Sequence, residues 1–246
     1  MKYSFIGLVC LCLSGVYSCQ PAGKKAGSKE NDGKIVLSIL KSFESENAQI
    51  YITKVNSRIS ELEIENARIS EFPVQLGQMD SLRKLLLSND SIRSIKGLDS
   101  LTSLTDLDLS DNQIKILPTI RHLKSLKFLR LDNNQIQDTL DCLLLPESLE
   151  ALIIGNNQIS AITNISRLIN LKTLSIDSNK LREFPEGLCE LKRIWSIEAN
   201  GNDFQEEIND FSCFEKLGSI VIDSKYLGQL VLPEGTVINY GFEDDY

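Results

Sequence analysis

The sequence has few of the side chains on which enzymes and metal sites depend. Its 246 residues include one histidine, His122, in a segment where we expect a solvated surface position. They contain no GxSxG, no HExxH and no glycine-rich loop that could cradle a phosphate. No CxxC pair or Cys/His cluster has metal-ligand spacing. These absences favour a non-enzymatic protein that uses no cofactor and no metal.

The chain also has fewer basic than acidic side chains. The chain has 26 Lys and Arg against 34 Asp and Glu, which gives a net charge of −8. A surface of this sign repels the phosphate backbone of nucleic acid at long range. We therefore expect no nucleic-acid partner.

The first apolar run is too short to span a bilayer. It covers Tyr3–Gly15, follows two residues that supply a basic start, and ends shortly before Cys19. The arrangement resembles the bacterial lipoprotein signal, in which a peptidase cuts before a diacylated cysteine, and Val16 and Ser18 fit that family's pattern. The resemblance implies a signal peptide at 1–18 and a lipidated Cys19. An ordinary cleaved secretory signal is the alternative, because the same small residues fit its cleavage preference.

The segment after Cys19 predicts a spacer. Residues 19–34 are rich in Gly, Lys, Ser and Asn and have no apolar anchor, which is typical of a flexible tether. Gln20 follows Cys19, which by resemblance to the enterobacterial sorting rule favours the outer membrane. The acidic run that marks surface export in Bacteroidota-type lipoproteins does not follow directly, so periplasmic and surface-facing orientations both stay open. The resemblance implies a lipid-anchored protein of the bacterial cell envelope that meets the membrane through its lipid alone.

One pattern dominates the chain after residue 58. LxxLxLxxNxL recurs at a spacing of 22 or 23 residues, with clear copies such as LTDLDLSDNQI and LKFLRLDNNQI. The chain resembles the leucine-rich-repeat family, whose signature this is, over about two-thirds of its length. The eight units open at Ile59, Leu82, Leu104, Leu126, Leu149, Leu171, Ile194 and Leu217.

The spacing within each unit predicts the fold. Apolar fourth and sixth positions alternate with polar ones, which indicates a short strand with one inward face. Stacked units would pair these strands in parallel, with Leu107, Leu129, Leu152 and Leu174 as adjacent buried rungs. An apolar-proline step such as Leu117-Pro118 then predicts a short helical or 3-10 return. The predicted fold is α/β, a curved leucine-rich-repeat solenoid with a parallel concave sheet and short helical or 3-10 convex segments.

The ends of the solenoid need covers, since an exposed terminal repeat would offer its core to other chains. We divide the folded part into an N-terminal cap at 35–58, eight repeats at 59–227, and a C-terminal cap with an acidic tail at 228–246. Residues 35–43 have the pattern of a short amphipathic helix, and 49–55 alternate like a strand. A hairpin or paired short strands are expected from four apolar residues near the end, Leu230, Leu232, Val237 and Ile238.

Asparagine at the ninth position is the second recurring constraint. An amide has both a donor and an acceptor, so it can satisfy the backbone groups that turn inward after each strand. The ladder fails at Ala67, Asp90 and Lys225. Its members are Asn112, Asn134, Asn157, Asn179 and Asn202.

Two further features of the sequence lead to predictions. The unit that opens at Leu126 lacks the apolar-proline step over 138–146, so we expect an irregular convex side with a local bulge there. Three cysteines, Cys142, Cys189 and Cys213, follow the signal and Cys19, and an odd number cannot pair completely. We expect buried free thiols, with a Cys189–Cys213 bridge as the alternative that an oxidising compartment permits.

The resemblance implies that the concave sheet face is the binding surface, formed by the third, fifth, seventh and eighth positions of each unit. Phe128, Ala151 and Ile153 form an outward apolar cluster in the middle repeats, with Arg130 beside it and Leu86 some distance away. Aromatic and arginine side chains are typical of interface hot spots. The alternative is that single exposed apolar residues are ordinary on protein surfaces.

Acidic side chains form the second outward feature. They could steer a basic partner, keep the face soluble, or bind a divalent cation, although no loop has EF-hand ligand spacing. Trp195, the one tryptophan, is expected to pack against a neighbouring repeat, with a place in the interface as the alternative. The acidic residues are Glu61, Glu63, Glu65, Asp106, Asp108, Asp132 and Asp177.

These features favour a protein-binding module of the bacterial cell envelope that uses the concave face of its solenoid. An adhesin-like binder of proteins or glycans on a host or neighbouring cell is one alternative. A structural envelope protein without a specific ligand is another.

Overall fold

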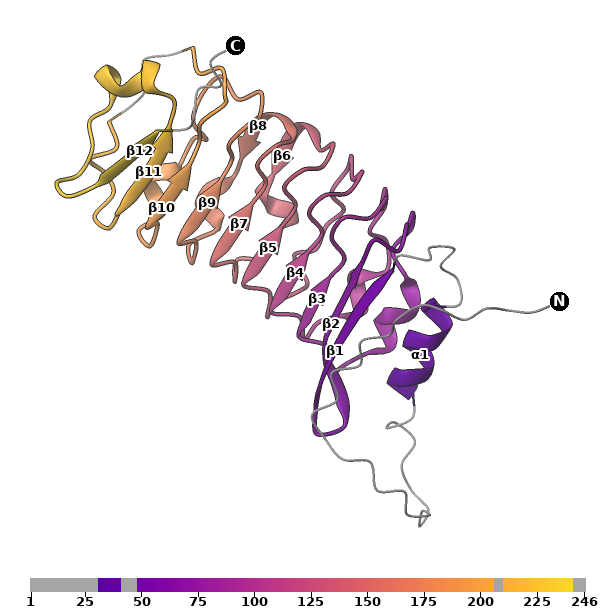
Figure 1. Ribbon diagram of the computed structural model, residues 1–246. Helices are drawn as coiled ribbons and strands as arrows, with labels where there is room; N and C mark the ends of the chain where they lie inside the picture. Colours follow the sequence, from indigo (N-terminus) through magenta and orange to yellow (C-terminus); the bar gives the residue numbers. More distant parts are fainter. Residues whose placement is uncertain (1–30, 41–47, 206–209, 241–246) are drawn as a thin grey trace.

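The computed structural model describes residues 31–40, 48–205 and 210–240. The expected signal peptide, Cys19, most of the expected tether and the acidic tail lie outside the described residues. The described chain winds into an elongated coil whose turns each add one strand to a long sheet on one side (Figure 1). No helix in these ranges has the length and apolar character needed to cross a membrane.

Ten strands form the long sheet, in the order β1-β2-β3-β4-β5-β7-β9-β10-β11-β12. The first pair is antiparallel and all the later pairs are parallel. The strands are β1 (Gln49–Val55), β2 (Arg58–Glu65), β3 (Lys84–Leu86), β4 (Asp106–Asp108), β5 (Phe128–Arg130), β7 (Ala151–Ile153), β9 (Thr173–Ser175), β10 (Ser196–Glu198), β11 (Ser219–Ile222) and β12 (Val237–Tyr240).

The inward residues align as the spacing predicts. Leu107 pairs with Leu129, Leu129 with Leu152, and Leu152 with Leu174, and each exposes at most 2% of its surface. A three-residue strand cannot bury a face alone, so stacking merges the inward leucines into one continuous core. Each of the eight predicted units contributes a strand, and β12 adds a ninth rung. The predicted leucine-rich-repeat solenoid with a parallel sheet is confirmed.

The chain returns through short 3-10 helices on the side opposite the sheet. The first follows Pro73 and buries Leu76, and the fifth follows Phe184 and Pro185 and buries Leu188. The predicted short helical returns are confirmed in most units, but the prediction for the return after Leu117-Pro118 was wrong, because that segment contains turns and no helix. The 3-10 helices are η1 (Val74–Gln78), η2 (Leu98–Ser100), η3 (Cys142–Leu144), η4 (Ile165–Arg167), η5 (Leu188–Glu190) and η6 (Ser224–Gln229).

The convex side of the unit after Leu126 is more regular than predicted. β6 (Gln137–Asp141) pairs in parallel with β8 (Gln158–Thr163) and forms a separate two-stranded sheet. The expected bulge is present, because the register shifts between Asp138 and Thr139 and Asp138 has a φ of 61°. Units with the apolar-proline step lose a backbone donor at this point, whereas these two units have no proline and keep it. The expectation of an irregular segment was therefore wrong.

The N-terminal cap begins earlier than predicted. The helix α1 spans Asn31–Leu40, so the last four residues assigned to the tether are folded. The reason is Asp32, which is buried and accepts hydrogen bonds from the Ile59 backbone N–H and from Arg58 Nε, both at 3.0 Å. This contact ties the helix to the first repeat. The strand expected at 49–55 is confirmed as β1, and residues 41–43 of the expected helix lie outside the described ranges.

The C-terminal cap contains paired short strands and no hairpin. β12 runs parallel to β11, and Val231 makes a parallel bridge with Asp210. The chain between these points turns through Pro233, so the last segment adds another turn of the solenoid. The hairpin alternative was wrong, and the paired-strand alternative is confirmed.

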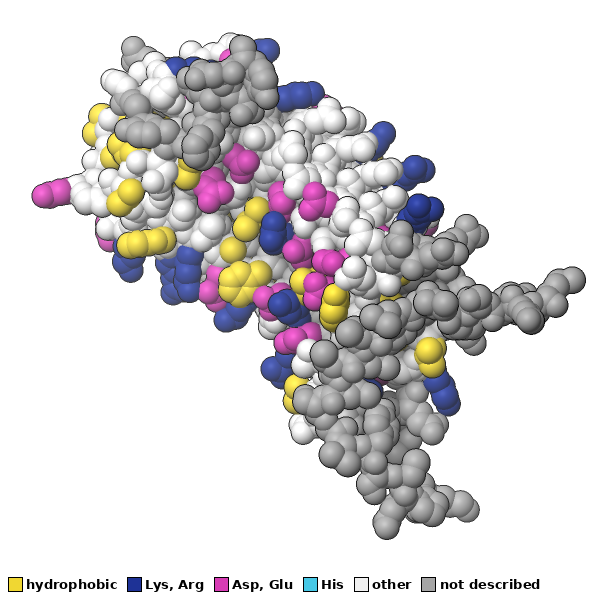
Figure 2. Space-filling view, in the orientation of Figure 1, with side chains coloured by type: hydrophobic (Ala, Val, Ile, Leu, Met, Phe, Trp, Pro, Cys, Tyr) yellow, Lys and Arg dark blue, Asp and Glu magenta, His cyan; other side chains and the backbone are white. Residues whose placement is uncertain are grey.

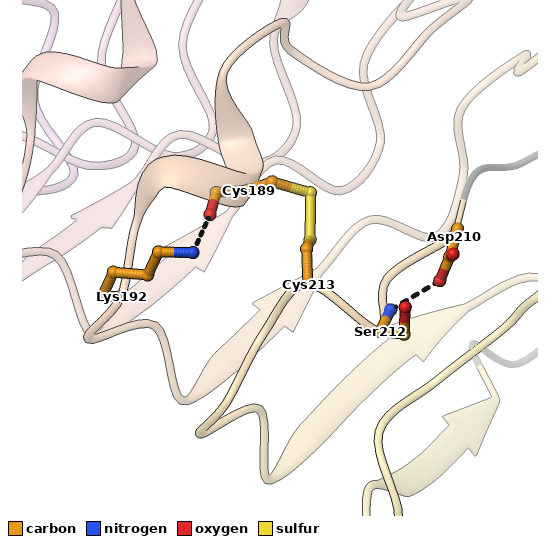
Figure 3. Close-up of a disulfide and its surroundings, with 5 residues drawn as sticks. All are labelled: Cys189, Lys192, Asp210, Ser212 and Cys213. Atoms are coloured by element: carbon orange, nitrogen blue, oxygen red, sulfur yellow. Dashed lines mark hydrogen bonds between the residues drawn. A yellow bond between two sulfur atoms is a disulfide. The ribbon is translucent and has the colours of Figure 1, made fainter.

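A disulfide joins two neighbouring convex turns at this end. Cys189 of η5 bonds to Cys213, with the two Cα atoms 5.6 Å apart (Figure 3). The expectation that both are free thiols was wrong, because stacking brings residues 24 positions apart in sequence into contact. Cys142 is a free buried thiol, as expected, and burial raises its pKa to about 12.

Candidate binding surface on the concave sheet

The concave surface arises directly from the alternation in each strand. The middle residue of every three-residue strand points into the core, so the residues on either side point out. These are the third and fifth positions of each unit, as predicted. Figure 2 shows this face, with hydrophobic side chains over the middle strands and acidic and basic side chains around them.

The asparagine ladder holds the turn after each strand. Asn112 Nδ2 donates to the Leu87 carbonyl at 2.7 Å and to the Leu109 carbonyl at 3.1 Å, and its Oδ1 accepts from the Ile92 N–H at 2.9 Å. Each donor therefore links its own turn to the preceding one. The predicted ladder is confirmed, since Asn134, Asn157, Asn179 and Asn202 repeat the arrangement.

Asp90 is the imperfect rung. Its Oδ1 accepts from the Ile69 N–H at 3.2 Å, as an asparagine would. Its Oδ2 is buried and has no hydrogen-bond partner among the described residues. Burial raises the pKa of this carboxyl, against backbone hydrogen bonds that lower it. A carboxylate can only accept, so Asp90 donates nothing to the carbonyls that an amide would bind at this turn, and the Leu87 carbonyl accepts a side-chain hydrogen bond from Asn112 of the next unit instead.

A second column of turn residues, at the eighth position of each unit, was not predicted from the sequence. The eighth position of each unit, just before the ladder, adopts a positive φ of 48° to 69° in the first seven units. Asparagine, aspartate and glycine tolerate this conformation, and six of the seven residues are of these types. That enrichment was the signal in the sequence. The residues are Asn66, Asn89, Asp111, Asn133, Asn156, Ser178 and Gly201.

The predicted apolar cluster is assembled by strands β5 and β7. Phe128 lies opposite Ala151 and Arg130 opposite Ile153, so these four side chains are neighbours. Phe128 exposes 46% of its surface, while Ala151 and Ile153 are half-buried. Leu86 also faces outward, but β4 separates it from the others. Four of the five residues therefore form one patch, which we name the Phe128 patch: Phe128, Arg130, Ala151 and Ile153.

Two carboxylates hold the arginine of this patch. Arg130 Nε and Nη2 each donate to Asp132 at 3.2 Å, and Asp108 Oδ2 lies 3.8 Å from Nε. Ser110 donates to Asp108 through its N–H and its hydroxyl, at 2.9 and 2.6 Å. Hydrogen bonding to Asp132 raises the pKa of Arg130. The guanidinium is thus fixed in place and its charge is compensated within the surface.

The acidic residues form two groups instead of one continuous stripe. Glu61 and Glu63 lie on β2, and Asp106 and Asp108 lie on β4. Lys84 of β3 stands between Glu61 and Asp106 in the register. Burial and the charge of Glu65 raise the pKa of Glu63. No cluster of three His, Cys, Asp or Glu able to hold a metal ion occurs in the described parts of the chain.

Two residues singled out in the sequence lie away from the patch. Trp195 is 60% exposed at the margin of the sheet and packs on the backbone of Gly218 in the next repeat, where a Cβ would come within 2.4 Å of the indole. This confirms the expected contact with a neighbouring repeat. The expectation of a solvated position for His122 was wrong: the residue is half-buried on the convex side, and its Nε2 is buried and lies 3.5 Å from Asp99 Oδ1.

Comparisons with known proteins agree with this architecture. The family model described as Leucine Rich repeats (2 copies) matches residues 102–143, and the model described as Leucine Rich Repeat matches residues 170–191. The chain is similar to the leucine-rich-repeat ectodomain of the receptor kinase SOBIR1 from Arabidopsis thaliana. That match has a TM-score of 0.50 and 22% identity, and it covers 63% of this chain and 97% of the other. No curated protein matches the chain. Leucine-rich-repeat domains generally serve as non-enzymatic scaffolds for protein–protein binding.

Proposed function

We propose that this chain is a non-enzymatic module of the bacterial cell envelope that binds a protein partner on its concave sheet. The observation that carries the proposal is the Phe128 patch, in which an exposed aromatic ring lies beside an arginine held by two carboxylates. Side chains that are fixed before binding lose little conformational entropy when a partner docks. Aromatic and arginine side chains also supply much of the binding energy in protein interfaces.

The charges around the patch define the partner's chemistry. Asp106 and Asp108 lie on β4 beside the Phe128 patch, Asp132 pairs with Arg130 of the patch, and the two glutamates of β2 lie further along the same face. A partner that offers an apolar anchor flanked by Lys or Arg would match both features. Complementary charge of this kind speeds association and excludes partners of the wrong sign.

A pair of double variants tests the proposal. Phe128→Ala with Ile153→Ala removes the apolar centre of the patch. Val74→Ala with Ile169→Ala removes two apolar side chains that are 60% and 57% exposed elsewhere on the surface. The full chain and both variants are used to capture proteins from envelope extracts, with quantification by mass spectrometry. We expect the patch variant to lose at least about tenfold of a specific protein, in line with hot-spot truncations. Equal capture by all three chains would refute the patch as a binding site.

The envelope location is part of the same proposal. It is supported by the resemblance of residues 1–19 to a lipoprotein signal, with Cys19 as the acylated residue. In cells, Cys19→Ala should move the chain from the membrane fraction to the soluble fraction. Retention in the membrane fraction would contradict the lipid anchor. Protease treatment of intact cells then separates the two orientations, because degradation supports the surface-facing, adhesin-like role and protection supports a periplasmic one.

A further inference from the structure

The flank next to the concave sheet is a second ordered surface. After each turn the backbone pairs again with the preceding repeat, as in Gln113 N–H to the Ile92 carbonyl at 2.9 Å and Gln158 N–H to the Ile136 carbonyl at 2.7 Å. The eleventh residue of each of the first seven units points into the core, so the tenth and twelfth point outward. We name the outward residues of the first six units at these two positions the flank stripe.

The flank stripe differs in charge from the rest of the chain. Its twelve residues comprise five basic residues, four glutamines and three serines, and none is acidic, although the whole chain carries a net charge of −8. Figure 2 shows a row of Lys and Arg side chains along the edge of the molecule that carries β6 and β8 in Figure 1. The basic members are Arg68, Arg93, Lys115, Lys180 and Arg182, all of them exposed.

The hydrogen bonds within the stripe leave it rich in donors. Arg93 Nε donates to Gln113 Oε1 at 3.1 Å, and Lys180 Nζ donates to Gln158 Oε1 at 3.2 Å. Each of these amide oxygens accepts from a basic side chain, which leaves the amide NH2 group as the donor that a ligand could use. Cations and amide donors side by side favour a ligand with many acceptor oxygens and negative charge.

Four of the five basic residues line two hollows, one over the second to fourth units and one at the C-terminal end of the stripe. Arg93 and Lys115 line the first hollow, together with Gln113. Lys180 and Arg182 line the second, which also contains Asp203 at the point where the stripe ends. Gln135 also lines the first hollow, whereas Gln137 and Gln158 lie between the two hollows. A ligand that reaches both hollows would have to be extended along the repeats.

The width and repeat of the stripe distinguish between anionic ligands. Successive rungs are about 4.8 Å apart, so the distance from the rung of Arg93 to that of Arg182 is about 19 Å, while the two rows lie only about 7 Å apart. Exposed acids at the next position, Glu71, Asp138 and Glu183, bound the stripe on its convex side. A broad anionic membrane would meet these acids, whereas a single chain would not. An extended peptide repeats its same-side groups about every 6.6 Å, which does not match the rungs.

We propose that the flank stripe binds a linear anionic polysaccharide built from uronic-acid units. Carboxylates of the chain would pair with the basic residues in the two hollows, and its hydroxyl and ring oxygens would accept hydrogen bonds from the glutamine amides. The contacts are exposed ion pairs and hydrogen bonds, so added salt weakens binding. This surface is separate from the Phe128 patch and its ligand does not depend on the protein partner proposed above.

The test compares two variants of equal charge. Arg93→Gln, Lys115→Gln, Lys180→Gln and Arg182→Gln together remove four charges from the stripe. Arg121→Gln, Lys124→Gln, Lys192→Gln and Lys216→Gln remove four exposed charges elsewhere. Affinity of the full chain for polygalacturonate is measured at low and raised salt, with a neutral glucan, poly-glutamate and anionic lipid vesicles as comparison ligands. Thermal unfolding verifies that both variants remain folded.

We expect the wild-type chain and the control variant to bind polygalacturonate alike and the stripe variant to bind about tenfold more weakly or worse, as four exposed pairs allow. Phe128→Ala with Ile153→Ala should leave this affinity unchanged, which separates this result from the concave-face proposal. Absence of polygalacturonate binding, or equal loss in both charge variants, overturns the inference. Equal affinity for poly-glutamate or for anionic vesicles also overturns it, because the polysaccharide would then not be the preferred ligand.

Discussion

The two halves of the solenoid share one backbone and differ in what they present outward. In the N-terminal half, strands β2 to β5 offer charged and apolar side chains, such as Glu63, Leu86 and Phe128. In the C-terminal half, the third positions of β9, β10 and β11 are Thr173, Ser196 and Ser219. The inward rungs are leucine or isoleucine in both halves. Inward positions therefore determine the fold, and outward positions are left free to carry binding chemistry.

The halves also differ in how firmly they are held together. The N-terminal half contains the imperfect Asp90 rung. In the C-terminal half the asparagine ladder runs from Asn157 to Asn202 and fails only in the last repeat, at Lys225. This half also has the Cys189–Cys213 disulfide and stacked aromatic rings, including Phe184 and Phe204 with centroids 4.4 Å apart. The N-terminal half, which contributes Phe128 and Arg130 to the Phe128 patch, thus has fewer of these stabilising contacts. Local unfolding should begin there, because opening free energy follows local contacts.

The largest effect is expected from weakening each half at an equivalent rung. Leu85 and Leu174 are both fully buried, and truncation of either to Ala should lower the free energy of unfolding by about 2 to 5 kcal/mol. Chemical denaturation measures the cost, and amide hydrogen exchange locates it. Leu85→Ala should speed amide exchange mainly in β2, β3 and β4. Leu174→Ala should speed it mainly in β9 and its two neighbours, β7 and β10. If amide exchange became faster by the same factor along the whole chain in both variants, the two halves would be equally stable against local unfolding.

Removal of the disulfide is expected to have the next largest effect. Cys189→Ala with Cys213→Ala should cost about 3 kcal/mol, because the bridge closes a long loop and restricts the unfolded chain. The loss should appear in the C-terminal half. A reducing agent should destabilise the wild-type chain to the same extent and leave the double variant unchanged, since Cys142 is buried and its thiol has a pKa of about 12. Sensitivity of the double variant to reduction would contradict this assignment.

Much of this comparison could be predicted from the sequence, because the constant spacing of the repeats specifies which residues point inward and which point outward. The spacing of leucines specified which residues are inward, and the ninth-position asparagines identified the ladder. These inferences hold because a single unit cannot bury its face, so only one stacking register satisfies every unit at once. The outward rows, including the adjacency of Phe128 and Ala151, followed from the same register.

The remaining features depend on contacts that a repeat pattern does not encode. The β6–β8 pairing depends on backbone donors that two neighbouring units both retain, and the disulfide depends on the depth of two convex turns. The start of α1 is determined by one carboxylate, Asp32, reaching the N–H of Ile59. The pairing of Arg130 with Asp132 likewise depends on side-chain geometry. Each of these is a single non-repeating interaction.

Completion of the ladder should make the halves more alike. Asp90→Asn supplies the amide donor that other rungs have, and it should stabilise the chain by about 1 kcal/mol near neutral pH. At the equivalent turn Asn112 donates to the Leu109 carbonyl, so the new amide would donate to that of Leu87. Asn179→Asp is the matched reverse change and should destabilise the chain. If both substitutions leave the unfolding midpoint unaltered, the missing donor has no energetic role.

The same rung has an expected pH dependence. Burial raises the folded-state pKa of Asp90 above the unfolded value of about 3.9. Its contribution to stability is therefore fully present below the unfolded pKa and is lost as pH rises through the folded pKa. Asparagine does not titrate, so the advantage of Asp90→Asn over wild type should grow as pH rises from about 4 towards neutrality. Measured unfolding free energies whose difference is constant over this interval would contradict the raised pKa.

The smallest effect on stability is expected from the polar outward residues. Phe128→Ala with Ile153→Ala should lower the free energy of unfolding by about 1 kcal/mol per site, because both side chains are partly buried. Thr173→Ala with Ser196→Ala should change it by less than about 0.5 kcal/mol per site, because polar surface positions outside special contacts contribute little. Only the first pair should reduce capture of a protein partner. If both pairs reduced it equally, the interface would extend over the whole concave sheet, and the Phe128 patch would be one part of a broader contact.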